Sequence, residues 1–271
     1  MITSVNSASS LLSSLSGSQS KLLKALQELG SGNSINSAAD NAVGMAQSLS
    51  YSVQLSSDAQ AMNNIQYGTS MLDTAATSLG QINQGLQDMR TLAVQAGDGA
   101  LSNSDLKTIQ GQIGQIAQGI DQISKGTQFN GQNLLDGSVG SLSLQIGPNA
   151  GDTQSVSLGN FSGSSLGISG LDVTSAGGQA NAISALDNAI QQVNSQGASI
   201  GALQNGLSSA QSNLSASYEN LAAAKSQISD TDFAQVASDL SQAKVQQQAS
   251  LKALALYNAT QKDNLLSLLP K

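Results

Sequence analysis

The side chains best suited to chemistry in this sequence are two aspartates, Asp230 and Asp232, which are separated by a single residue. Paired carboxylates of this kind can serve as a general acid and a general base. Here they stand in the segment Ile228–Phe233, between two helical patterns, where Asp and Thr commonly accept hydrogen bonds from the first backbone N–H groups of a helix. We therefore interpret them as helix caps and predict no catalytic role.

The other motifs with chemical potential are weak. The Gly-rich stretch at residues 159–178 contains no Gly-Lys-Ser/Thr sequence and follows no strand-to-helix unit, so it does not predict a phosphate-binding loop. Asn160, Asn213 and Asn258 each begin an Asn-x-Ser/Thr triplet. Such triplets arise by chance in a chain this rich in Ser and Asn, and we assign them no role.

The composition excludes most enzyme classes. The 271 residues include no Cys, His or Trp, and 10% are charged, against about 25% in typical soluble proteins. Without Cys and His, the sequence lacks the ligands of most zinc and copper sites, as well as Cys nucleophiles and Ser-His-Asp triads. We predict no catalytic residues, no metal site and no cofactor.

The charge balance argues against a nucleic-acid partner. The formal net charge is −7, and Arg90 is the one arginine in the chain. Binding to nucleic acid requires a basic face that neutralises phosphates, and no cluster of Lys and Arg supplies one.

The N-terminal segment does not have the pattern of a cleaved secretory signal. It has no basic region, and serines interrupt the leucines Leu11, Leu12 and Leu15. No stretch of about 18 apolar residues is present, so we expect no membrane insertion. If the protein leaves the cell, we expect it to use another route.

Three long segments carry residues at the three-and-four spacing of a heptad repeat, which marks the seam of a helix that packs on another helix. They are Ile65–Ala93, Leu106–Ile123 and Ile183–Ile228. The second begins after Ser102–Asp105, a typical N-cap sequence. The third helix would be roughly 70 Å long at about 1.5 Å per residue. We predict a mainly α fold built on a long antiparallel helical coiled-coil rod.

The two ends of the chain are also predicted to be helical. A leucine-rich stripe runs from Leu11 to Leu29 and stops at Gly30–Asn33, a helix-ending sequence. A second apolar stripe runs from Val236 to Tyr257 and on towards Leu269. Single helices of this kind are marginally stable in water, because most helical stability comes from packing an apolar face. We expect the terminal helices to pair and to fray until something covers them.

Between about residues 126 and 180 the pattern changes to short alternating runs. Leu142, Leu144 and Ile146 alternate with polar residues, Gly147–Gly151 provides a turn, and the alternation resumes over Val156–Leu158. This pattern predicts a β-hairpin, which we place at the tip of the rod.

The flanks of the heptad seams carry mostly Ser, Gln, Asn, Ala and Gly instead of the Glu and Lys that select partners in a simple coiled coil. Small uncharged side chains allow helices to pack closely on more than one face. This favours a crowded assembly over an isolated dimer.

Read from both ends, the sequence resembles bacterial flagellin. The N-terminal matches are Leu29–Gly32, Ile35–Gly44, Leu86–Gln95 and Gln128–Leu135, and the C-terminal matches are Ala224–Ala234, Gln246–Ala249 and Leu265–Leu269. The resemblance implies an inner-tube domain formed by residues 1–43 with 233–271, and a rod domain at 44–232 that includes the hairpin region. The variable outer domains that many flagellins carry are expected to be absent, so the chain resembles a short form.

The resemblance also implies a function. A flagellin is a non-enzymatic structural subunit that self-assembles into the helical, extracellular filament used for swimming motility. It is secreted unfolded by type III export, and its expected partners are itself, an export chaperone, the filament cap and the hook-junction proteins. The alternatives are a hook–filament junction protein of the same organelle or, from another class, a secreted adhesin or enzyme. An adhesin or an enzyme would need a functional insertion, and residues 138–180 are too short and too rich in Gly and Ser to supply one.

Two groups of functional residues are expected. The apolar stripes of the terminal helices give the subunit-interface candidates Leu22, Leu26, Leu240, Leu251, Leu254, Leu265 and Leu268. The second group is a possible host-receptor patch, Asp88, Arg90, Leu92, Gln95 and Gln112. Flagellins that activate the vertebrate Toll-like receptor for flagellin carry a basic residue at the first of these positions and a Glu at the last, so we expect this patch to be weakened.

Overall fold

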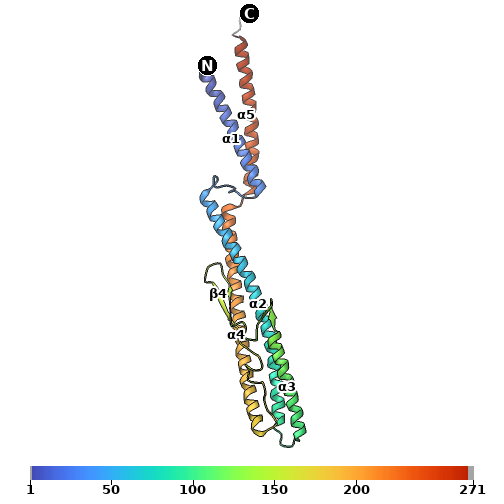
Figure 1. The fold of residues 1–271 in the computed structure, drawn as a ribbon. Coiled ribbons are helices and arrows are strands. Elements are labelled where there is room, and N and C mark those ends of the chain that lie inside the picture. The colour runs from blue at the N-terminus through green and yellow to red at the C-terminus, as the bar shows by residue number, and fades with distance from the viewer. Residues whose placement is uncertain (1, 268–271) are drawn as a thin grey trace. The chain divides into compact units, whose positions relative to one another are not determined.

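The computed structural model describes residues 2–267, with side chains described for residues 9–175 and 177–263. The helices are α1 (Ile2–Ser31), α2 (Ala42–Ala96), α3 (Asn103–Gly126), α4 (Ala176–Ser229) and α5 (Phe233–Ser267). The strands are β1 (Gln128–Phe129), β2 (Gln132–Asn133), β3 (Ser141–Gln145) and β4 (Thr153–Ser157). The chain forms two compact units. Figure 1 shows the fold, with colour running along the chain by residue number. Unit 1 comprises the residues up to Leu55 and from Glu219 onward, and unit 2 is Ser56–Tyr218.

Unit 2 is built on the seam that the heptad spacing predicts. The heptad positions of α2 from Ile65 to Ala93 are all buried, and Leu72, Leu86 and Leu186 are completely inaccessible to solvent. Helix α3 begins with the expected capping box, in which Ser102 and Asp105 bond to each other's backbone N–H groups. The mainly α, antiparallel helical fold predicted from sequence is confirmed.

Polar pairs beside the seam align α2 with α4 in one antiparallel register. The Arg90 Nε lies 2.6 Å from the Asp187 carboxylate, Asn83 donates to Asn194 at 2.7 Å, and Gln204 donates to the Asp73 carboxylate at 2.7 Å. From one pair to the next, both helices advance by the same number of residues, so all three pairs require the same alignment.

The predicted β-hairpin is present as the antiparallel pair β3–β4, in which Leu142 lies opposite Val156. It lies along α2 and α4, not at the tip of the rod where the sequence analysis placed it. Asn64 of α2 donates to the Gln145 carbonyl at 3.1 Å, and Gln196 of α4 donates to the Ser157 carbonyl at 3.0 Å. The hairpin lies against these two helices because one of its faces is apolar and is stabilised when an apolar surface covers it.

A second, shorter hairpin, β1–β2, was not predicted. Its turn residues Asn130 and Gly131 both have positive φ angles, 50° and 79°, as two-residue hairpin turns require. The strands are only two residues long, too short to show an alternating pattern. The following segment contributes Leu134, Leu135, Phe161, Ile168 and Val173 to the core of unit 2.

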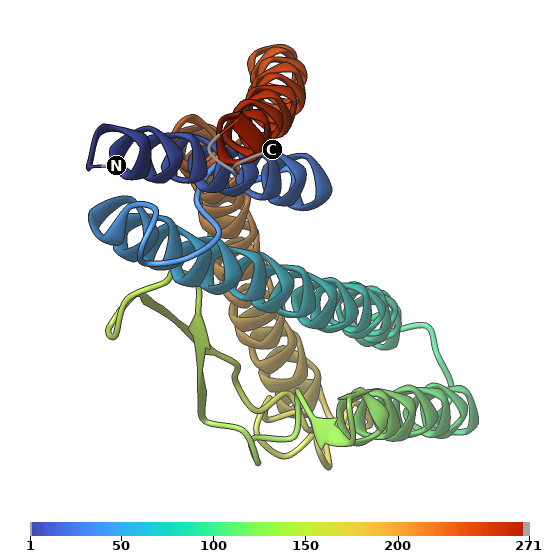
Figure 2. The same ribbon diagram turned by 90° about the horizontal axis from the view of Figure 1, so that it is seen from above.

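In unit 1, α1 and α5 pack against each other (Figures 1 and 2). The buried residues on these two helices are mostly small: Ser18, Ala25, Val236, Ala243 and Ser250. Small side chains allow two helix backbones to approach closely, and the leucines with described side chains on these helices remain half-buried or exposed.

Candidate self-assembly surface

The two aspartates that could have formed a catalytic pair have separate structural roles. The Asp232 carboxylate accepts hydrogen bonds from the N–H groups of Ala234 and Gln235 at 2.9 and 3.1 Å, which makes it the N-cap of α5. Asp230 accepts from the Ser226 hydroxyl at 2.6 Å. The capping interpretation of Asp232 is therefore confirmed. Among the described residues no group of three or more His, Cys, Asp or Glu side chains could hold a metal ion.

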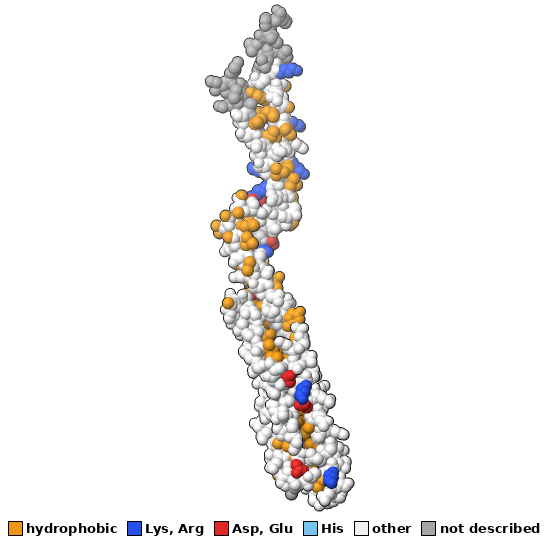
Figure 3. Space-filling model, viewed as in Figure 1, with side chains coloured by type: hydrophobic (Ala, Val, Ile, Leu, Met, Phe, Trp, Pro, Cys, Tyr) orange, Lys and Arg blue, Asp and Glu red, His pale blue; other side chains and the backbone are white. Residues whose placement is uncertain are grey.

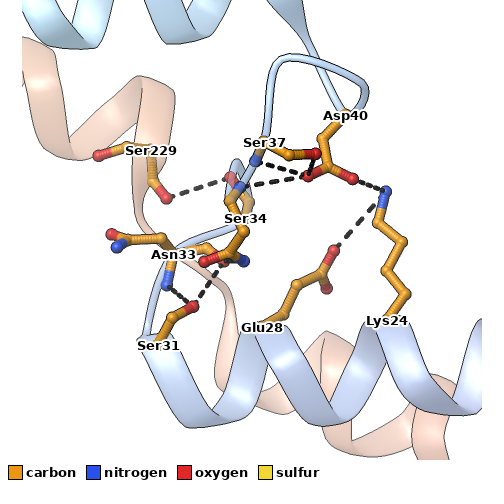
Figure 4. Close-up of polar contacts among 9 residues, drawn as sticks. Lys24, Glu28, Ser31, Asn33, Ser34, Ser37, Asp40 and Ser229 are labelled. Carbon is orange, nitrogen blue, oxygen red and sulfur yellow. Dashed lines mark hydrogen bonds and ion pairs between the residues drawn. The ribbon is translucent and has the colours of Figure 1, made fainter.

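Asp230 belongs to a region of unit 1 that we call the joint, residues 32–41 together with 229–232 (Figure 4). Two backbone hydrogen bonds hold its two segments together: Ser34 N–H to the Ser229 carbonyl at 2.7 Å, and Thr231 N–H to the Gly32 carbonyl at 3.0 Å. Gly32 has a φ of +72°, a conformation that costs glycine little. This explains the glycine at position 32, directly after the end of α1.

Asp40 is the centre of the joint's connecting loop. Its carboxylate accepts hydrogen bonds from the Asn36 N–H at 3.2 Å and from the Ser37 N–H and hydroxyl, both at 2.9 Å. The Lys24 ammonium of α1 lies 3.2 Å away on the other carboxylate oxygen. The hydrogen bond from the Ser37 hydroxyl, followed by that from Lys24, holds the pKa of the Asp40 carboxyl below its ordinary value. The Ile35–Gly44 motif thus encodes this loop.

The terminal helices of unit 1 expose large apolar side chains. Of the sequence-predicted interface residues, Leu26 and Leu251 are 47% and 49% exposed, and Leu22, Leu240 and Leu254 are half-buried. Leu265 lies in the last turn of α5 without a described side chain, and Leu268 lies outside the described residues. The chain's own fold therefore leaves much of this apolar surface in solvent.

A further apolar surface lies on the first turns of α2, and sequence reasoning missed it. Val43, Leu49 and Val53, which we call the α2 strip, are 77%, 54% and 64% exposed. Figure 3 shows hydrophobic side chains gathered over this part of the helix. The sequence does carry a signal, because no charged residue occurs between Asp40 and Asp58.

Charge and exposed apolar surface are divided between the two units. Unit 2 contains ten aspartates against Arg90, Lys107 and Lys125, so the whole formal net charge of −7 lies there. In the described part of the chain, every exposed large hydrophobic side chain except Tyr67, Val94 and Tyr218 belongs to unit 1. Copies of unit 2 repel one another electrostatically, whereas unit 1 offers contact without net repulsion.

The possible receptor patch is spread over two helices of unit 2. Asp88 is exposed on α2 and accepts a hydrogen bond from Gln84. Arg90 is held by Asp187, whose hydrogen bond and charge raise the pKa of the guanidinium. Leu92 is half-buried against the core. Gln95 of α2 and Gln112 of α3 are exposed.

Exposed apolar surface of this extent is typical of a protein that binds other protein molecules. None of the helices in residues 2–267 is long and apolar enough to cross a membrane. The fold and the surface together define a helical protein whose terminal region offers exposed apolar side chains for contact with other protein molecules.

Comparison with known proteins identifies the family. The bacterial flagellin N-terminal helical region matches residues 2–139, and the bacterial flagellin C-terminal helical region matches residues 183–269. The chain is 34% identical to a flagellin of Xenorhabdus nematophila over 95% of this chain and 96% of that protein. It is 33% identical to the flagellar filament 30.7 kDa core protein of Treponema maltophilum over 90% of both chains. The chain belongs to the flagellin family.

Solved structures show the same fold. The crystal structure of Bacillus cereus flagellin is 30% identical in sequence, has a TM-score of 0.52, and aligns with 60% of this chain and 94% of that one. A putative flagellar hook-associated protein from Vibrio parahaemolyticus has a TM-score of 0.60 over 70% of this chain and all of that one. At 15% identity, the second likeness concerns the fold alone.

Proposed function

We propose that this protein is a structural subunit of the bacterial flagellar filament, the propeller for swimming. Two observations together carry the proposal. The chain matches a flagellin over almost the whole length of both proteins, and apolar side chains of its terminal region remain exposed in the single chain. Flagellins are structural proteins, and no catalytic role is proposed for any residue.

Self-assembly would occur through unit 1. We assign the predicted interface leucines, Leu22, Leu26, Leu240, Leu251, Leu254, Leu265 and Leu268, together with the α2 strip, to contacts between neighbouring subunits. Leu26, Leu251 and Val53 support this assignment, because each leaves about half or more of its side chain exposed. Contacts between two different surfaces of identical subunits do not close on themselves, so they produce an open filament.

We further propose that residues 1–43 with 233–271 form the inner-tube domain and that residues 44–232 form the rod domain. The packing of α1 on α5 supports the pairing of the two chain ends. The two compact units divide the chain after Leu55 in α2 and before Glu219 in α4 instead, so the first turns of α2 and the end of α4 group with the terminal helices.

Export and partners follow from the same family. We propose secretion through the flagellar type III pathway to the extracellular filament, with an export chaperone, the filament cap and hook-junction proteins as partners. The absence of Cys from the sequence supports this route, since a chain that forms no disulfides can be exported unfolded and refold outside the cell.

The experiment that tests the proposal compares the free subunit with the filament by far-ultraviolet circular dichroism. If the terminal helices fold on assembly, as expected for helices whose apolar faces lack cover, the filament has a higher helix content than the free subunit. Equal helix content in the two states would contradict this account of assembly. Deletion in the source cell separates the two flagellar roles: loss of a filament subunit removes the filament, whereas loss of a junction protein leaves unassembled flagellin in the medium.

A further inference from the structure

The joint contains a charged contact whose role is not explained by the exposed apolar surfaces. Asp40 accepts three hydrogen bonds from residues 36 and 37 of its own loop, and its fourth contact, to Lys24, reaches across to α1. Figure 4 shows the Lys24 side chain extending from α1 towards the Asp40 carboxylate. The loop that leads into α2 is thereby tied to the helix that precedes it.

The charged groups around Asp40 come from two segments. On α1, Glu28 lies one turn from Lys24, and its carboxylate is 3.9 Å from the ammonium, against 3.2 Å for Asp40. On the returning segment, Asp230 pairs with Asn33 of the loop, and its carboxylate is engaged by Ser226. Lys24 is therefore the cation that compensates the charge of the Asp40 carboxylate. Glu28 competes for the same ammonium group from a greater distance.

We propose that the Lys24–Asp40 ion pair is a positioning latch for self-assembly: it holds α1 in a fixed direction from the joint, so that the leucines around it meet the neighbouring subunit in one orientation. Leu22 and Leu26 lie two residues before and after Lys24 on the same helix. The latch rests on the proposed function, because its purpose is the presentation of an assembly surface.

A latch of this kind contributes little to the stability of a single molecule but has a measurable effect on the equilibrium constant for assembly. The side chains of Lys24 and Asp40 are 56% and 21% exposed, and exposed ion pairs are weak and screened by salt. Every subunit that joins a filament must hold α1 in the competent direction, so loss of the pair lowers the equilibrium constant for each addition. We expect an increase of about threefold in the critical concentration for assembly, within the range measured for exposed pairs.

The acid dependence of the latch has a defined sign. Because the pKa of Asp40 is lowered in the folded chain, the carboxylate favours the folded joint at any pH above the ordinary Asp pKa of about 3.9. The contribution is lost as the pH falls through the lower folded value. At neutral pH the latch is fully formed.

The test is a double-mutant cycle on the full chain, read out as the critical concentration for filament formation at pH 7 in low salt. Lys24→Gln removes the ion pair and leaves the loop bonds of Asp40 in place, whereas Asp40→Asn removes the charge at the other end. We expect each single variant to raise the critical concentration, and the double variant to be no worse than Asp40→Asn alone. In about 1 M salt the effect of Lys24→Gln should shrink, because the Debye length falls to about 3 Å.

Lys21→Gln is the matched control, because it removes the same charge from α1 one turn earlier. It should show no coupling to Asp40→Asn. Additive effects of Lys24→Gln and Asp40→Asn, or coupling as large for Lys21 as for Lys24, would overturn the latch while leaving filament formation by the unmodified chain intact. Failure of the unmodified chain to form filaments would instead contradict the proposed function itself.

Discussion

The α2 strip offers a direct prediction about assembly, centred on Val53→Ser. Val53 is 64% exposed in the single chain. Full burial of a valine side chain contributes about 1.5 kcal/mol at the lower end of measured values, so covering the exposed part in a filament contributes about 1 kcal/mol. Val and Ser have similar helix propensities, so the variant should leave the folding of α2 unchanged.

The assay is the critical concentration for polymerisation, measured by sedimentation of filaments from solutions of known total concentration. A loss of about 1 kcal/mol per subunit corresponds to an increase of about fivefold. Gln54→Ser is the control, because the neighbouring Gln54 is also exposed but is not apolar. If Val53→Ser assembles as readily as the unmodified chain, or if Gln54→Ser is equally impaired, the α2 strip is not a subunit contact.

Three further predictions concern the terminal stripe, the hairpin and the receptor patch. Leu254→Ala should weaken polymerisation without unfolding unit 2, because truncation of a leucine that becomes buried costs about 2–5 kcal/mol; filaments of normal heat stability would contradict this. Gly68→Ala should lower the melting temperature relative to Gly80→Ala on the same helix, because a Cβ at Gly68 would lie 2.5 Å from Leu144 of the hairpin, whereas Gly80 has open space; equal melting temperatures would show that the hairpin does not dock there. Free subunits should activate the flagellin receptor poorly, and Asp88→Arg with Gln112→Glu should raise their potency in reporter cells, since a reversed charge at an interface opposes binding; strong activation by the unmodified subunit would refute this.

The sequence predicted the core of unit 2 well, because that core depends on periodicity. Leu72 and Leu86 lie in an unbroken heptad run, and both are fully buried. The hairpin was also predictable from alternation, but its position was not. Alternation shows which face of a strand is apolar, whereas the partner of that face depends on where Gly68 leaves space on α2.

The exposed apolar surface was predicted only in part, because periodicity does not distinguish a face that packs within the chain from a face that stays exposed. The leucine stripe of α1 suggested pairing with α5 through leucines. In the structure, Ala25 and Ala243 are buried while Leu23 remains 61% exposed. The α2 strip was missed because Val43 and Val53 continue no heptad run, and only their exposure in the folded chain reveals them.

The central claim is that this chain polymerises into the flagellar filament. It is tested most directly by electron microscopy of filaments sheared from the surface of the source cells, with mass spectrometry of the same preparation. The account predicts long helical filaments whose bulk protein is this chain. A filament fraction that lacks this chain, or that contains it only in trace amounts at the hook junction, would contradict the claim.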